Sequence, residues 1–237
     1  MKIFITGDTH GNIDTKKLNT KKWPEQKTLT RDDVIIVAGD FGCPWQSMDT
    51  PEDRYWLDWY ENKPCTTLFI DGNHENFDVL EQLPIVEFCG AKCHKLRDHV
   101  LHIMRGEILH IAGHSIWCMG GARSTDKIFR TQGISWWPQE IPTYEECDRA
   151  LQSFISEKPD VIITHEGPSE LILKLYEHCS DQHTDTVSNF MQEILNQCRE
   201  LKISPEWFMG HHHIDKDYEI EGGPTIHMLY QNIIELK

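Results

Sequence analysis

Five short apolar runs that stop abruptly at polar residues constrain this sequence more than any other feature. Each run is rich in β-branched or aromatic residues, which is typical of a buried β-strand. The runs are Ile3 to Thr6, Val34 to Ala38, Thr66 to Ile70, Val161 to Thr164 and Trp207 to Met209. The residues that follow them read GDTHG, GDFG, DGNHE, HEGP and GHHH. The pattern predicts five strands whose ends carry metal-binding residue types.

The polar ends of these strands are expected to meet at one edge of the fold. In open α/β sheets, ligands bind outside the carboxyl ends of the strands, so clusters that are far apart in sequence converge there. Residues two apart in an extended chain point to the same side. Asp8 and His10 would therefore reach one centre, and the same holds for His211 and His213.

The side chains gathered in this way form a mixed oxygen and nitrogen donor set without a thiolate. The set contains two carboxylates, one amide oxygen and four imidazoles: Asp8, His10, Asp40, Asn73, His165, His211 and His213. Such donors suit Mn, Fe or Zn. Because they exceed the ligands of one tetrahedral zinc, they are enough for two metals that share a carboxylate, with positions left for water and substrate.

The remaining signals predict one mixed α/β domain over residues 1–237. Further strands are expected at Val100 to Met104, Ile108 to Ala112, Ile116 to Met119, Thr225 to Leu229 and Ile233 to Leu236. Helices are expected at Thr143 to Glu157, Ser169 to Glu177 and Thr186 to Leu201. Thr143 and Glu146 predict a capping box. The first three strands start about 30 residues apart, the length of a βαβ unit, and closely spaced strands predict a hairpin-rich antiparallel region from Val100 to Met119.

The charge balance and the cysteine pattern bound the partners and the location. The chain carries 23 Lys and Arg against 38 Asp and Glu, a formal charge of -15, so long nucleic acid and anionic lipid are unlikely partners. Its longest purely apolar stretch, Val34 to Ala38, is far short of the roughly 20 residues of a membrane span. Without a CxxC pair or a secretory signal, we expect reduced thiols in a cytoplasmic protein. No sequence feature indicates an oligomeric state.

As an ordered set, GDTHG, GDFG, GNHE, THEGP and GHHH resemble the five signatures of the calcineurin-like metallophosphoesterase superfamily. The pattern spans Asp8 to His213, almost the whole chain. The resemblance implies a sandwich of two mixed β-sheets flanked by helices. It also implies two divalent or trivalent metal ions (Mn, Fe or Zn) and a ligand set: Asp8, His10 and His213 for one metal, Asn73, His165 and His211 for the other, and Asp40 as the bridge.

The same resemblance implies a phosphoester hydrolase with Asp40 and His74 as its catalytic residues. In that family a hydroxide that bridges two metals attacks phosphorus in line. His74, as a protonated imidazole, would donate to the leaving oxygen or stabilise its charge. Glu75, or an acid elsewhere, would keep that proton in place. His212 matches a variable position and stays outside the ligand set.

One departure from the family concerns how the phosphate is held. Protein Ser/Thr phosphatases carry Asp-Arg-Gly after the second signature, whereas Phe41 to Pro44 here reads FGCP and lacks that phosphate-clamping arginine. Arg123 or Arg130 in segment 120–138 would grip the phosphate instead, because a guanidinium binds two phosphate oxygens. The segment, which also carries Trp136-Trp137, is either a mobile substrate-reading loop or a surface loop with packed tryptophans and solvated charges.

The substrate class and two competing functions stay open at this point. Phosphomonoesters, small phosphodiesters or nucleotides, and phosphoproteins are all compatible with the motifs. The competing functions are a Ser/Thr phosphatase-like enzyme and a metal-bearing scaffold that has lost catalysis. A scaffold would be expected to have lost ligands or His74, and all of them are present, so the sequence favours an enzyme.

Overall fold

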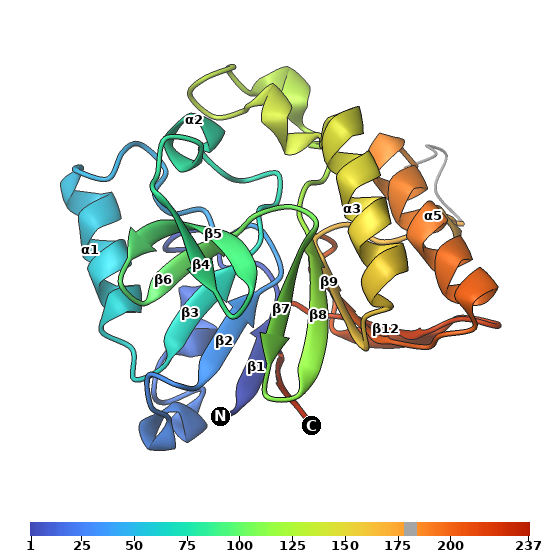
Figure 1. Cartoon of the computed structure of the whole chain (residues 1–237). Coiled ribbons are helices and arrows are strands. Elements are labelled where there is room, and N and C mark those ends of the chain that lie inside the picture. The colour runs from blue at the N-terminus through green and yellow to red at the C-terminus, as the bar shows by residue number, and fades with distance from the viewer. Residues whose placement is uncertain (178–183) are drawn as a thin grey trace.

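Two mixed sheets contain all of the predicted strands in the computed structural model, which describes residues 1–177 and 184–237 (Figure 1). Within these residues one sheet has seven strands, in spatial order β13 (Ile233–Leu236), β1 (Ile3–Thr6), β2 (Val34–Val37), β3 (Thr66–Phe69), β6 (Val100–Ile103), β5 (Ala91–Arg97) and β4 (Ile85–Phe88). The other has six, in order β11 (Lys216–Glu219), β12 (Thr225–Met228), β10 (Glu206–Met209), β9 (Val161–Thr164), β8 (His114–Met119) and β7 (Glu107–Ile111). The predicted sandwich of two mixed sheets is confirmed.

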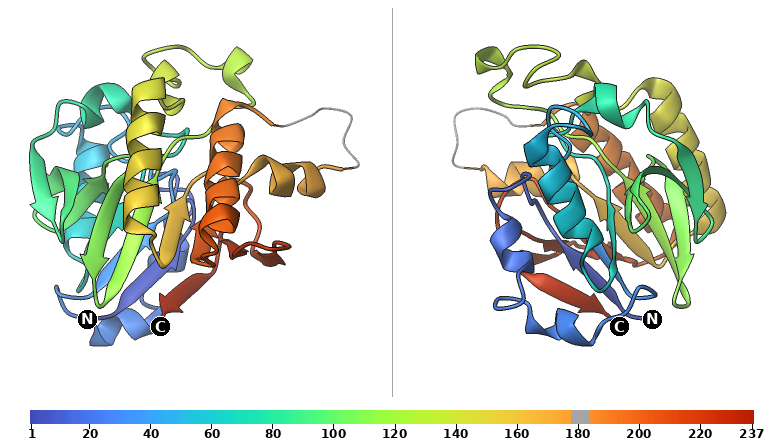
Figure 2. Two further views of the ribbon diagram at one scale, coloured as in Figure 1. Left: turned by 45° about the vertical axis from the view of Figure 1, so that its right-hand side comes forward. Right: turned by 90° about the vertical axis from the view of Figure 1, so that its left-hand side faces the viewer.

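Helices cover the two outer faces of the sandwich (Figures 1 and 2). The described helices are α1 (Pro51–Glu61), α2 (Phe77–Leu80), α3 (Tyr144–Glu157), α4 (Ser169–Leu175) and α5 (Thr186–Leu201). Helix α1 packs on the seven-stranded sheet, and α3 and α5 pack on the six-stranded sheet. The predicted capping box of Thr143 and Glu146 is present at the start of α3. Among residues 1–177 and 184–237, no helix has the length and apolar character that a membrane crossing needs.

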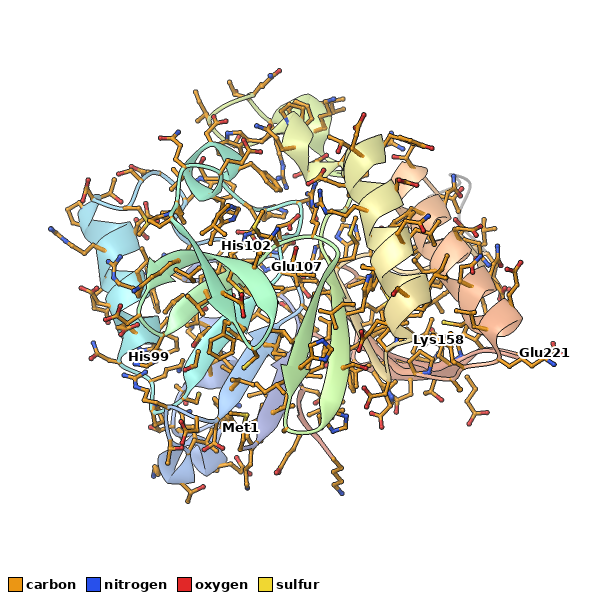
Figure 3. All side chains as sticks on the ribbon, in the orientation of Figure 1. Met1, His99, His102, Glu107, Lys158 and Glu221 are labelled. Carbon is orange, nitrogen blue, oxygen red and sulfur yellow. The ribbon has the colours of Figure 1, made fainter. Side chains whose placement is uncertain are left out.

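Burial on both faces explains why the central strands are apolar throughout rather than alternating. In β1, Ile3 and Ile5 belong to the core between the sheets, while Phe4 packs edge-on against Trp23 on the outer face. In β9, Ile163 lies between the sheets, and the preceding isoleucine packs with residues of α3 and α5. Side chains fill the space between the layers (Figure 3).

Parallel pairing brings the polar strand ends to one end of the molecule. β1, β2 and β3 run parallel, with Thr6 beside Val37 and Val37 beside Phe69. β9 and β10 also run parallel, with Thr164 beside Met209. All five strands therefore end on the side away from the chain termini, where segment 122–137 (yellow-green in Figure 1) also lies.

The expected hairpin-rich region from Val100 to Met119 is only partly correct. β7 and β8 do form an antiparallel hairpin. β6, however, pairs with β5 and β3 in the other sheet, so the chain changes sheets between Ile103 and Glu107. The close spacing of apolar runs does not distinguish a hairpin from such a crossing, because both need only a short turn.

Five of the described helices and strands were not predicted: β4, β5, β11, α1 and α2. β5 and the edge strand β11 contain several charged residues, and the edge strand β4 has only four residues, which are partly exposed. None of the three therefore shows an uninterrupted apolar run; charged residues on an edge such as β11 also hinder pairing with other chains. α1 had an available signal: Thr50 caps it by accepting from the Asp53 N–H, and Pro51 takes its first position. The free cysteines of the described part are seven, and Cys179 lies outside the described residues.

Candidate metal centre

The carboxyl ends of the five strands bring the seven predicted donors into two groups that share Asp40. The ligand atoms of Asp8, His10, Asp40 and His213 lie within 4.8 Å of one another, and so do those of Asp40, His165 and His211. Asp40 lies between the groups, because its Oδ2 is 3.1 Å from His10 Nε2 and its Oδ1 is 3.3 Å from His165 Nε2.

Asn73 and His213 belong to different groups. Asn73 Oδ1 is 3.3 Å from His165 Nε2, which places the amide with the second group. His213 Nε2 is 3.7 Å from Asp8 Oδ1, in the first group. The family resemblance implies the same grouping, and the ligand roles stay a prediction.

The backbone at the donors is turned rather than extended. His10, Asp40, His211 and His213 all have positive φ values, of 44°, 49°, 71° and 52°. Asp8 and His10 lie in one group, as expected, although the chain is not extended there, whereas His211 and His213 fall in different groups. Left-handed geometry costs a side-chain-bearing residue about 1 kcal/mol and is often found at functional sites. Tight turns at the strand ends, not strand alternation, aim these side chains.

Two glycines make the close packing of the donors possible. A Cβ at Gly39 would lie 2.1 Å from His165 Nδ1, and a Cβ at Gly72 would lie 2.2 Å from Asp40 Oδ1. Such distances are far below van der Waals contact, so any larger residue would displace the donor. These glycines belong to the GDFG and GNHE motifs.

The two carboxylates of the donor set are buried and carry like charges. Asp8 is 0% exposed and Asp40 is 2% exposed. Burial raises the pKa of Asp8, and the neighbouring Asp40 adds to that rise. Buried carboxylates of this kind are paired or coordinate metals. Two carboxylates, an amide oxygen and four imidazoles converge here, and these donors fit cations such as Mn, Fe or Zn.

Hydrogen bonds to the far side of two imidazoles hold their orientation. The Nδ1 of His10 is 2.8 Å from Asp14 Oδ2, and the Tyr230 hydroxyl donates to the other oxygen of that carboxylate over 3.0 Å. The Nδ1–H of His165 donates to the Ala38 carbonyl over 2.8 Å. Both rings consequently present Nε2 to the centre, as metal-binding histidines commonly do with such partners.

A buried polar chain orients the amide of Asn73. The Nδ2 of Asn73 donates to Ser124 Oγ over 3.2 Å. Ser124 in turn donates its hydroxyl and its backbone N–H to the two oxygens of Glu140, over 2.5 and 2.9 Å. With Nδ2 engaged, the Oδ1 of Asn73 faces the donors. The roles of Ser124 and Glu140 had no sequence signal, because neither residue belongs to a motif.

Glu166 performs the same task for His211 and was also missed. Its Oε2 is 3.5 Å from His211 Nε2 and its Oε1 is 2.9 Å from His212 Nε2. Although burial opposes it, His211 and His212 lower the pKa of Glu166 to about 2, so the carboxylate is ionised. His212 lies outside both donor groups, next to Glu166. The position of Glu166 directly after His165 in HEGP was the available signal.

His74 lies beside the centre with Arg130 bound to its ring. The His74 N–H donates to Asp40 Oδ1 over 2.8 Å, and Arg130 Nη2 is 2.7 Å from His74 Nε2. Burial lowers the pKa of His74 to about 4, and Arg130 contributes to that decrease. The ring is therefore neutral in this arrangement, with Nε2 as an acceptor. This differs from the expected protonated imidazole.

Glu75 does not hold the proton of His74, contrary to one expectation. Its Oε1 accepts from the Phe41 N–H over 2.7 Å and its Oε2 accepts from the Gly42 N–H over 3.0 Å. Burial, followed by the charge of Asp40, raises the pKa of Glu75. The residue therefore supports the GDFG turn. Arg130, not an acid, is the partner of the His74 ring.

Segment 120–138 combines features of both interpretations given above. Trp136 and Trp137 are buried, and the Trp137 indole donates to Asp78 Oδ2 in α2 over 2.8 Å. Arg130, anchored by Asp126 at 2.7 Å, reaches His74. Arg123 is exposed near the start of α5, where it opposes the burial-driven rise in the pKa of Asp185.

Comparisons with known proteins also indicate a phosphoesterase. A family model described as calcineurin-like phosphoesterase matches residues 1–215. Lariat debranching enzyme A of Xenopus laevis is 31% identical over 96 aligned residues, which cover 35% of this chain and 18% of that protein. The lariat debranching enzyme of Drosophila pseudoobscura pseudoobscura is 23% identical over 249 aligned residues, 90% of this chain and 42% of that protein. The chain thus spans less than half the length of these curated relatives.

Among solved structures, the 5′-nucleotidase from Candida albicans SC5314 aligns with 97% of this chain and 45% of its own length. The identity is 15% and the TM-score is 0.46.

Proposed function

Because the chain belongs to the calcineurin-like phosphoesterase family, we propose that it hydrolyses a phosphoester with the help of two metal ions. The observation that carries the proposal is the pair of donor groups that share one carboxylate, Asp40. A single site would need about four of these donors, whereas seven converge.

The ligand assignment follows the two groups. Asp8, His10 and His213 would hold one cation, Asn73, His165 and His211 the other, and Asp40 both. Bound Mn, Fe or Zn ions would supply activation of water as the nucleophile and neutralisation of the phosphoryl charge. Hydrogen bonds to Asp14, to the Ala38 carbonyl and to Ser124, and the contact of Glu166 with His211, keep the donors oriented. Loss of such a partner typically lowers metal affinity.

Arg130 and His74 would handle the phosphate and the leaving group. Hydrolysis forms a bond from a water oxygen to phosphorus, breaks the ester bond and leaves an oxygen that needs a proton. A bound phosphate would compete for the Arg130 guanidinium, since charge-assisted bonds to phosphate are stronger than a bond to a neutral imidazole. Release of Arg130 would raise the pKa of His74 and free Nε2 to act on the leaving oxygen.

We propose a phosphomonoester or a small phosphodiester as the substrate. The sequence of Phe41 to Pro44 disfavours a Ser/Thr phosphatase-like enzyme, and the charge of -15 disfavours long nucleic acid. The names of the curated relatives refer to debranching of a lariat, which keeps diesters in the test. Retention of every donor and of His74 favours catalysis over a silent scaffold.

The first test is hydrolysis of p-nitrophenyl phosphate and bis-p-nitrophenyl phosphate by metal-stripped protein refilled with manganese. We expect release of p-nitrophenol by the wild type and background release by Asp40→Asn. The matched control is Asp33→Asn, which changes another buried aspartate far from the donors and should retain activity. Preference for the monoester or the diester assigns the ester class. No release by protein that contains two metals would support the scaffold instead.

A further inference from the structure

A cavity of about 290 Å³ opens beside the candidate metal centre. His10 and His74 form its wall on the side of the centre, and Trp45, Trp56 and Ile13 supply much of its apolar lining. The volume is near the lower limit of small-molecule sites, about 300 Å³. A group attached to a phosphate at the centre therefore has room here for one ring system and little more.

Trp45 is held in place on this wall by its main chain. The buried carboxylate of Asp53 accepts the backbone N–H groups of Trp45, Gln46 and Ser47 over 2.6, 2.8 and 3.1 Å. On the other side, Asn76 Nδ2 donates to the Trp45 carbonyl over 2.7 Å. The segment is thus organised before any ligand binds, which reduces the entropy lost on binding.

The indole of Trp45 continues an aromatic surface that starts at His74. The Trp45 and His74 rings are 6.4 Å apart and tilted by 30°, and Trp137 packs edge-on behind Trp45 at 5.6 Å. Trp45 is only partly buried and lines the cavity. A half-exposed indole of this kind, supported from behind, offers a face on which a planar ring can stack.

The charges around the cavity limit what the ring can carry. Among the described residues that line it there is no lysine or arginine. Glu52 also lines the cavity and accepts from Asn12 Nδ2 over 2.8 Å. The polar side chains of the lining thus include this carboxylate and the amides of Asn12 and Gln46. An anionic group would meet no counter-charge here, whereas N–H donors on the edge of a neutral heterocycle would find acceptors.

We propose that this cavity binds the leaving group of the substrate and that this group carries a flat, uncharged heterocycle the size of a nucleobase. The proposal rests on the proposed phosphoesterase function, because the cavity gains meaning from the phosphate site beside it. It adds what that function does not specify, namely the chemistry on the far side of the scissile bond.

The test compares adenosine 5′-monophosphate with ribose 5-phosphate in the manganese-loaded full chain, or the methyl diesters of both if diesters are preferred. The two compounds have the same scissile bond and similar leaving oxygens, so their kcat/KM ratio reports the base. We expect a ratio of about 10 or more, the size of one stacking contact. Trp45→Leu should bring the ratio close to one. Equal values in the wild type would overturn the proposal.

A second variant covers the case in which Trp45→Leu does not fold. Ile13 lines the cavity and is 69% exposed, so Ile13→Glu should fold and should reduce the ratio several-fold. Ile85→Glu is the matched control, because Ile85 is 57% exposed on β4 and does not line the cavity. If Ile13→Glu and Ile85→Glu both keep the wild-type kcat/KM ratio, the cavity is not the subsite for the base.

A binding measurement separates this proposal from the proposed function. Saturation-transfer NMR with adenosine, which has no phosphate, should place the strongest transfer on the base protons and lose it in Trp45→Leu or Ile13→Glu. If no phosphoester is hydrolysed by protein with two metals, the function fails while this signal still decides the cavity. If esters are hydrolysed but the base protons receive no transfer and the ratio is one, only the cavity proposal fails.

Discussion

Buried carboxylates follow three neighbouring parallel strands, Asp8 after β1, Asp40 after β2 and Asp71 after β3, and their charges are compensated in different ways. Asp71 accepts from Arg105 Nε and Nη2 over 2.9 and 2.5 Å, and its other oxygen is 3.2 Å from Nε2 of His102 (labelled in Figure 3). Asp40 instead faces the rings of His10 and His165. One cluster has a permanent cation, while the other has titratable rings.

The difference indicates a structural role for the Asp71 cluster and a ligand-binding role for Asp8 and Asp40. The Asp71 cluster is complete, since Arg105 also bonds to Glu146 at 3.2 Å and to the Gln139 carbonyl at 2.7 Å, and its role is to join β3, β6 and α3. Around Asp8 and Asp40 the chain supplies acceptors in excess, and a cation from solution can complete the set. A buried carboxylate without a permanent counter-charge therefore indicates a ligand site more strongly than burial alone.

The largest expected effect comes from Asp40→Asn. Since Asp40 belongs to both donor groups, the variant should lose both metals and all hydrolysis while its circular dichroism stays native. The loss of metal is measured as the metal content of the protein after equilibration with manganese and gel filtration. Manganese at about 100 times Kd should stabilise the wild type by about 2.7 kcal/mol per ion and should not stabilise the variant. Two retained metals would contradict the bridging position.

Arg105→Met should show the opposite profile, a loss of stability rather than of metal. Removal of the guanidinium leaves Asp71 charged and buried, which costs about 3 to 5 kcal/mol. Urea unfolding measures it. Arg97→Met is the control, because Arg97 pairs with half-exposed Asp58 at 3.1 Å and such pairs contribute about 1 kcal/mol or less. Asp71→Asn in the Arg105→Met background should recover part of the loss; equal losses in both single variants would refute the comparison.

Ser124→Ala should weaken the centre without removing a donor. The Asn73 amide would lose its partner, and loss of such an orienting bond lowers metal affinity by about 10- to 100-fold. A competition assay with a fluorescent chelator measures the affinity. Ser115→Ala on β8 changes a hydroxyl that bonds to Asp160, far from the donors, and should leave the affinity as it is. An unaltered affinity in Ser124→Ala would mean that Asn73 is oriented by other contacts.

The smallest effect concerns Asp33, at the opposite end of β2 from Asp40. Although burial opposes it, hydrogen bonds from Thr30 and Lys2 lower the pKa of Asp33 below its usual 3.8. Its contribution to stability is therefore complete above about pH 3.8 and is lost as the pH falls below that value. Between pH 5 and pH 3, the wild type should lose more unfolding free energy than Asp33→Asn, which has no carboxylate to protonate. Parallel denaturation curves of the two proteins would contradict this.

Most strands were predictable because burial on both faces leaves a local signature. The runs at Ile3, Val34, Thr66, Val161 and Trp207 are apolar throughout, and each ends within a residue or two of its predicted boundary. β5 and β11, which carry several charged residues, and the short, partly exposed β4 leave no such signature. The assignment of β6 and β7 to different sheets also has no local cause, because it depends on which distant strands they pair with.

By itself the sequence predicted which residues gather at the candidate centre, because short polar motifs directly after buried parallel strands lie at one sheet edge. Only the tertiary structure decided how they are held and what lies beside them. Ser124, Glu140 and Glu166 orient donors from other parts of the chain, Arg130 binds His74 across 56 residues, and Trp45 and Ile13 come together in one cavity. Such contacts depend on packing between distant segments, and no local pattern of residues encodes them.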